Sequence, residues 1–181
     1  MGCHTAAAWA LANPDRVSAL ILIGPVFTGT GLGPDEDRWD LRASALSEGG
    51  PEAFARTVAE EFTGSDEGRS LIERLASDRI RKHRHPEAVA EALREVPRSA
   101  PFEGISSLKM LRSPVLVVAS RDDLDPGHPL EVAESWAETI PGARLVVEEP
   151  GESPLAWQGG RLSRVITEFL DQRDDPGQEP G

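Results

Sequence analysis

The chain has 181 residues, of which 39% are hydrophobic and 28% are charged, so it is long enough for one globular domain with a sizeable core. Its formal net charge of −12 argues against a nucleic-acid partner, which needs a basic face, and against an anionic membrane. The longest apolar stretch, residues 19–23, is far shorter than the ~18 residues of a membrane span. With one cysteine, Cys3, and no pattern of a secretory signal, we expect a cytoplasmic protein without disulfides.

The first elements are a helix and a strand. The Ala-rich segment Cys3–Asn13 predicts a helix that ends before Pro14, because proline disfavours helical geometry in the residue before it. The aliphatic run Ala19–Ile23 predicts a strand buried on both faces, as in a parallel sheet. A Gly-rich and Pro-rich loop follows over residues 27–37.

The middle of the chain, from Arg38 to about Arg98, is polar and helical in pattern and has no strand signal. Four helices are predicted here, near Trp39–Leu46, Pro51–Phe62, Glu67–Lys82 and Pro86–Glu95. Pro51 and Pro86 stand where first-turn prolines belong. So long a helical insertion between two strands indicates a cap rather than a crossover, and we predict a cap or lid over residues 27–104.

Strands and helices alternate again from Pro114. The expected elements are a strand over Val115–Ala119, a helix over Pro129–Thr139, a strand over Ala143–Val147 and a helix over Leu162–Phe169. This alternation predicts an α/β core with a parallel three-stranded sheet and flanking helices, formed by residues 1–26 and 105–172. The Pro-rich, Gly-rich and acidic segment 173–181 predicts a disordered tail.

A family resemblance rests first on the start of the chain. Small residues in the first helix lead to Pro14-Asp15-Arg16-Val17 and then a strand, and Met1-Gly2 resembles the last two positions of a G-x-S-x-G nucleophile elbow. The chain therefore resembles the C-terminal portion of an α/β-hydrolase fold protein. Counting back from Pro14 places the serine immediately before Met1, so the Met1 amide would form half of the oxyanion hole.

The loop after the second strand resembles the family's acid loop. Counting back from the following helix selects Asp125, which precedes Pro126, whereas counting from the end of the strand selects Asp122 or Asp123. The catalytic acid stays open among the three, with Asp125 preferred. The resemblance implies that this acid holds a histidine in the right tautomer and stabilises the imidazolium.

The catalytic histidine is expected after the last strand, and Glu152 stands at that position. A carboxylate, whose ordinary pKa is about 4, is a poor base for a serine hydroxyl. His128, in the acid loop, is an alternative base, although a surface role is more common for such a residue. Cys3 and His4, just past the elbow, are weaker candidates for the site.

The resemblance implies hydrolysis of a small ester, lactone or related carbonyl substrate by serine attack, without metal or cofactor. The alternative is a non-catalytic pseudoenzyme, a binding module or a truncated gene product, because the serine is missing and Glu152 replaces the histidine. We expect the chain by itself to be inactive. We also expect it to self-associate through the exposed edge of the first strand.

Overall fold

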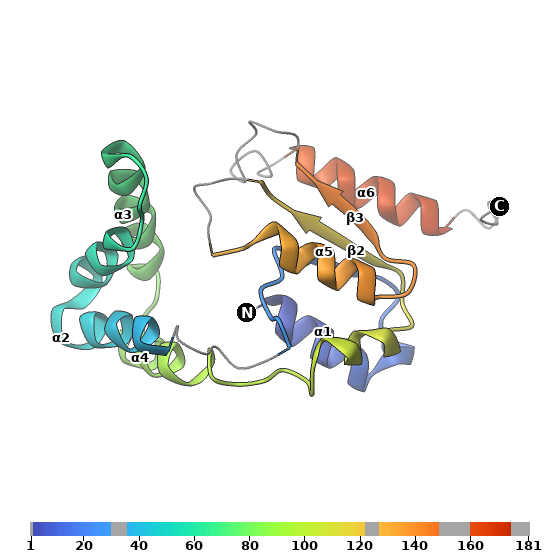
Figure 1. Cartoon of the computed structure of the whole chain (residues 1–181), viewed down its shortest axis with the longest axis horizontal. Helices are drawn as coiled ribbons and strands as arrows, with labels where there is room; N and C mark the ends of the chain where they lie inside the picture. The colour runs from blue at the N-terminus through green and yellow to red at the C-terminus, as the bar shows by residue number, and fades with distance from the viewer. Residues whose placement is uncertain (1, 30–35, 122–126, 149–159, 175–181) are drawn as a thin grey trace. The chain divides into compact units, whose positions relative to one another are not determined.

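The computed structural model describes residues 2–29, 36–121, 127–148 and 160–174 (Figure 1). The chain divides into two compact units. One, the sheet unit, consists of residues 1–29 and 101–181, and the other, the helical unit, consists of residues 30–100.

A three-stranded parallel sheet with the strand order β1-β2-β3 forms the centre of the sheet unit. Figure 1 shows β2 and β3 side by side. Its strands are β1 (Leu20–Ile23), β2 (Val115–Ala119) and β3 (Arg144–Val147). The register pairs Ile23 with Val118 and Val118 with Val146, so the three strands end at the same edge of the sheet. The predicted parallel α/β class is therefore confirmed, with each strand within one residue of its expected range.

The two faces of the sheet are covered by different elements. Helix α1 (Gly2–Ala12), the 3₁₀ helix η3 (Ile105–Met110) and helix α5 (Leu130–Thr139) contribute to a cluster with Val115 and Val117. Helix α6 (Gly160–Asp174) packs through Phe169 against Leu116 and Val118 on the opposite face. All five residues of β2 are buried as a result, because alternate side chains of a strand point to opposite faces.

Several boundaries differ from the sequence expectation. Helix α6 reaches Asp174, two residues into the segment predicted as a disordered tail, while residues 175–181 lie outside the described residues. Two 3₁₀ helices, η1 (Pro14–Arg16) and η3, were not predicted. Such short turns carry no hydrophobic period that a sequence pattern could reveal.

The helical unit contains α2 (Glu36–Glu60), α3 (Asp66–Ile80) and α4 (Pro86–Glu95). Helix α2 is broken at Gly50, whose φ of 73° lies in the left-handed region, so the two helices predicted on either side of this point are consecutive segments. The α3 helix begins at a Ser65 cap that accepts a hydrogen bond from the Gly68 N–H. Ala43, Leu46, Ile80 and Ala90 form the buried centre of this unit.

The indole of Trp136 in α5 connects the loop after β1 to the core by a hydrogen bond. Its ring is fully buried, and its N–H donates a 2.7 Å hydrogen bond to the Phe27 carbonyl. We predict that Trp136→Phe lowers the free energy of unfolding by about 1–3 kcal/mol, because it leaves the buried carbonyl unpaired. The control Trp9→Phe, at a side chain 45% exposed, should cost less than about 1 kcal/mol. Equal urea midpoints for the two variants would contradict this assignment.

Candidate functional site

The carboxyl ends of the three strands bring residues from distant parts of the sequence to one edge of the sheet. Gly24 follows β1, Ser120 follows β2 and Glu148 follows β3. Helix α1 begins at the same edge, since the Cys3 thiol lies 3.1 Å from the Ile23 carbonyl oxygen. In open α/β sheets, ligands bind outside the carboxyl ends of the strands, so this edge is the candidate site.

Glu148 ties the ends of β2 and β3 together. Its Oε1 accepts hydrogen bonds from the Ser120 hydroxyl (2.5 Å) and the Arg121 N–H (2.8 Å). Its own N–H donates to the Ala119 carbonyl at 3.3 Å. The side chain is 1% exposed, and Oε2 has no hydrogen-bond partner among the residues that the structure describes. Because a buried carboxylate is costly unless it is hydrogen-bonded, these bonds offset much of its burial.

His128 lies over the carboxyl end of β1. A Cβ atom added at Gly24 would stand 3.1 Å from His128 Cδ2, and the Gly24 φ of +58° lies in the left-handed region. Glycine is therefore required here both by backbone conformation and by the close approach of the imidazole. The structure places this sequence candidate at the candidate site, with an exposed side chain.

His4 is part of an aromatic cluster beneath the same edge. Its ring stacks on Trp136 at a centroid distance of 6.3 Å and meets the edge of Phe27 at 5.8 Å, and Phe102 contacts both of these partners. Burial lowers the pKa of His4 to about 4. The imidazole is therefore uncharged at neutral pH and a weak base, which favours a packing role over a catalytic one.

Cys3 does not have the properties of an activated nucleophile. Its thiol donates to the Ile23 carbonyl, and burial raises the pKa of the thiol above its ordinary value. The reactive form of cysteine is the thiolate, so a thiol held protonated at neutral pH is a poor nucleophile.

The remaining candidates, namely Met1, Asp122, Asp123, Asp125 and Glu152, lie outside the described residues, and their roles stay predictions. Within the described ranges, no group of three or more His, Cys, Asp or Glu side chains could hold a metal ion. No helix in the described part of the chain is long and apolar enough to cross a membrane.

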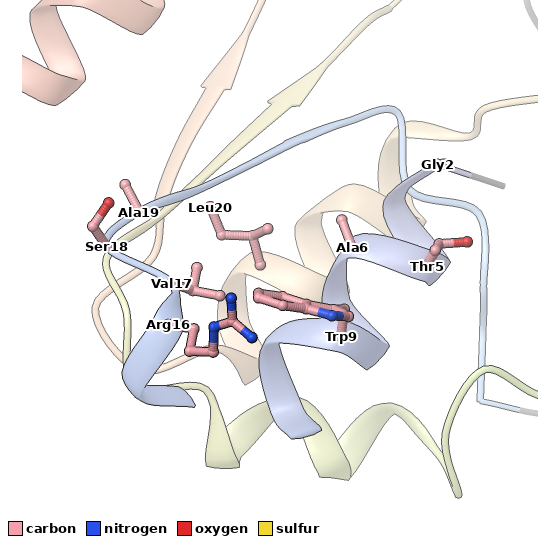
Figure 2. Close-up of a pocket in the computed structure, with 9 residues that line it drawn as sticks. All are labelled: Gly2, Thr5, Ala6, Trp9, Arg16, Val17, Ser18, Ala19 and Leu20. Carbon is pink, nitrogen blue, oxygen red and sulfur yellow. The ribbon is translucent and has the colours of Figure 1, made fainter. Parts of the chain in front are cut away.

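An open groove of about 750 Å³ lies between α1 and the segment that leads into β1 (Figure 2). Ala6 and Trp9 line it from α1, and Val17 and Leu20 line it from the other side. The Arg16 guanidinium lies 5.7 Å from the centre of the Trp9 ring. The groove is mostly apolar, and among the described residues β1 pairs with a strand only on its β2 side.

Glu148 is absent from the sequence candidates, because no local sequence pattern distinguishes it. A charged residue that directly follows an aliphatic strand is expected to be solvated, and only the pairing of β3 with β2 shows that it is buried. The pairing of Ala119 with Val147 brings Glu148 beside Ser120 and Arg121, which the sequence separates widely.

The chain belongs to the α/β-hydrolase fold family, whose model matches residues 1–159. A relative from Pseudomonas savastanoi pv. phaseolicola (strain 1448A / Race 6), described as a carbamate hydrolase, RutD, is 27% identical over 169 residues. That match covers 90% of this chain and 61% of the relative. A 2-hydroxy-6-oxononadienedioate/2-hydroxy-6-oxononatrienedioate hydrolase from Pseudomonas putida is 29% identical over 180 residues, covering 94% of this chain and 60% of the relative. The chain thus spans about three-fifths of the length of these relatives.

Solved structures share the same fold. A thermophilic esterase from Thermogutta terrifontis, with malate bound, superposes with a TM-score of 0.69 at 24% identity, covering 96% of this chain and 63% of the esterase. The enol-lactonase from Burkholderia xenovorans LB400 gives a TM-score of 0.66 at 22% identity, covering 94% of this chain and 63% of the lactonase. At these identities the likeness establishes the fold.

The lowered pKa of His4 predicts a dependence of stability on pH. Since the pKa of a free imidazole is about 6.5 and that of folded His4 is about 4, the unfolded chain binds more protons between these values. The stabilisation is therefore fully present above pH 6.5 and is lost as the pH falls towards 4. The urea midpoint of the parent protein should therefore fall between pH 7 and pH 4.5, and we predict that it falls less in the His4→Phe variant.

His83→Phe is the matched control, because that imidazole is exposed in the helical unit. It should leave the pH dependence of the parent protein unchanged. A His4→Phe variant with the same decline as the parent would refute the buried, uncharged state of His4.

Proposed function

We propose that this α/β core serves the hydrolysis of a small ester, lactone or related carbonyl compound. The observation that carries the proposal is the match of residues 1–159 to the hydrolase family. Relatives described as carbamate and oxo-dienedioate hydrolases support a carbonyl carbon as the target of attack. The reaction would be acyl transfer to a serine followed by attack of water, a route that needs no metal or cofactor.

The proposal assigns the catalytic acid to the loop after β2. Asp125, which counting back from the following helix selects, is preferred, and Asp122 and Asp123, which counting from the end of the strand selects, are the alternatives. The acid would orient an imidazole and stabilise its charged form. His128 is the exposed imidazole that the structure describes at this edge, where it lies against Gly24, while Glu152 occupies the position expected for the family's histidine.

The nucleophile is proposed to come from outside residues 1–181, from the position before Met1, with the Met1 amide in the oxyanion hole. Two potential nucleophiles that the structure describes at the carboxyl edge donate hydrogen bonds within the protein. The Cys3 thiol donates to the Ile23 carbonyl, and the Ser120 hydroxyl donates to the Glu148 carboxylate. The helical unit is proposed to act as a cap that sets the shape of the substrate. The single cysteine agrees with a reducing compartment, and we propose a cytoplasmic location.

A non-catalytic protein is the second candidate, and the presence of Glu152 at the histidine position favours it. The two candidates differ in what the gene encodes upstream. The hydrolase proposal requires in-frame codons that end in Gly-x-Ser directly before Met1, whereas a stop codon there would contradict it.

We predict that a fluorophosphonate probe does not label the 181-residue protein, and that it labels the extended protein at the elbow serine. In the extended protein Asp125→Asn should lower kcat for p-nitrophenyl butyrate by about 100-fold or more, since the acid sets the tautomer of the base. Asp122→Asn and Asp123→Asn are the matched controls and should change kcat less. Labelling and ester turnover by the 181-residue protein would refute the non-catalytic candidate and the external nucleophile together.

We further propose that the chain self-associates through the open edge of β1. The Ile23 side chain at this edge is 46% exposed, and the neighbouring groove is mostly apolar. An exposed strand edge of this kind offers unpaired backbone groups to a second chain.

Light scattering over a range of protein concentrations should therefore show mass that rises with concentration. Ile23→Lys should shift the protein towards the monomer, because a charged side chain on an edge strand opposes pairing. Leu41→Lys, at an apolar residue of α2 that is 64% exposed, should leave association unchanged. A monodisperse monomer with a sharp melting transition would contradict the proposal.

A further inference from the structure

We propose that Glu148 is a positioning residue that fixes the backbone at Ser120 and Arg121, the described residues from which the chain enters the proposed acid loop. The effect of Glu148 on catalysis rests on the proposed function, whereas its effect on the backbone is argued from the contacts of Glu148 alone. The relevant feature is a carboxylate directly after β3 that binds the residues directly after the neighbouring strand β2.

Three consecutive residues of the chain are held by Glu148. Its N–H donates to the Ala119 carbonyl at 3.3 Å, so the ladder between β2 and β3 continues past the last paired strand residues. Its Oε1 then accepts from the Ser120 hydroxyl and the Arg121 N–H. The backbone direction at Arg121 is therefore set by the sheet, and Asp122 is the next residue.

The chemistry of the position argues for a specific role rather than for general packing. Glu148 is the one charged residue buried in the described part of the chain, at 1% exposure. A buried carboxylate costs more than an apolar side chain of similar size, and here Oε2 lacks a partner among the described residues. If this position served only to fill the core, a valine or leucine, as at the adjacent strand positions, would make the protein more stable.

An apolar side chain at this position could not replace the hydrogen bonds of the carboxylate. The Arg121 N–H would lose its acceptor, and the loop would leave the sheet without a fixed first residue. A site whose reacting groups stand on loops depends on such supporting hydrogen bonds for its geometry. Glu148 thus acts on the proposed reaction through the loop, without contact to the substrate.

Amide hydrogen exchange, followed residue by residue by NMR, tests the proposal in the 181-residue protein. We expect Glu148→Ala to accelerate exchange of the Arg121 amide by roughly tenfold or more relative to the amides of β2. Glu148→Gln keeps an acceptor oxygen and the side-chain shape, so Arg121 exchange should stay within about threefold of the parent. Ser120→Ala removes the other donor and should likewise leave the Arg121 amide protected.

Equal acceleration of the Arg121 and β2 amides in Glu148→Ala would overturn the proposal, because it would show that Glu148 supports only overall stability. An unchanged Arg121 amide would overturn it as well. If Glu148→Ala does not fold, the outcome is decided by Glu148→Gln and Ser120→Ala, where loss of Arg121 protection in both variants would refute the assignment.

A kinetic measurement in the extended protein separates this proposal from the proposed function. Glu148→Ala should lower kcat by about tenfold or more with KM within about threefold, and Glu148→Gln should restore most of kcat. If the parent protein hydrolyses no ester, the proposed function fails, and the exchange result still decides whether Glu148 holds the loop.

Discussion

The structure of the sheet unit depends on the complete burial of β2. Its five residues, Val115–Ala119, lie between two parallel strands and between two helical layers, so neither an edge nor a face of this strand meets water. Burial of such a strand supplies a large part of the hydrophobic stabilisation of a small core. It also leaves the strand little freedom to move, so the position at which the next residues leave the sheet is fixed.

The position of the candidate site follows from the fixed position of β2. Because the three strands are parallel and in register, Gly24, Ser120 and Glu148 emerge at one edge. Gly24 permits the close approach of His128. Glu148 binds Ser120 and Arg121, the first residues after β2. The chain belongs to the α/β-hydrolase family, and its strand ends provide fixed starting points for the loops to which we assign the proposed chemistry.

Much of the fold could be predicted from the sequence, since long aliphatic runs and helical periods are local signals. The three strands and the helices α1, α3, α4 and α5 follow such patterns closely, whereas α6 is longer at both ends than the predicted helix. The break of α2 at Gly50 also agrees with the sequence, because glycine followed by proline usually separates elements. The site was less predictable, because the contacts of Glu148 depend on strand pairing and the lowered pKa of His4 depends on its burial in the folded core.

The dependence of the fold on β2 is tested most directly by native-state hydrogen exchange measured under increasing urea. If β2 is the centre of the cooperative unit, the amides of Leu116, Val117 and Val118 should exchange only through global unfolding, with the urea dependence of the whole sheet unit. The amides of the helical unit and of α1 should open at lower free energy. Exchange of the β2 amides through local opening, as fast as that of α1, would contradict the account.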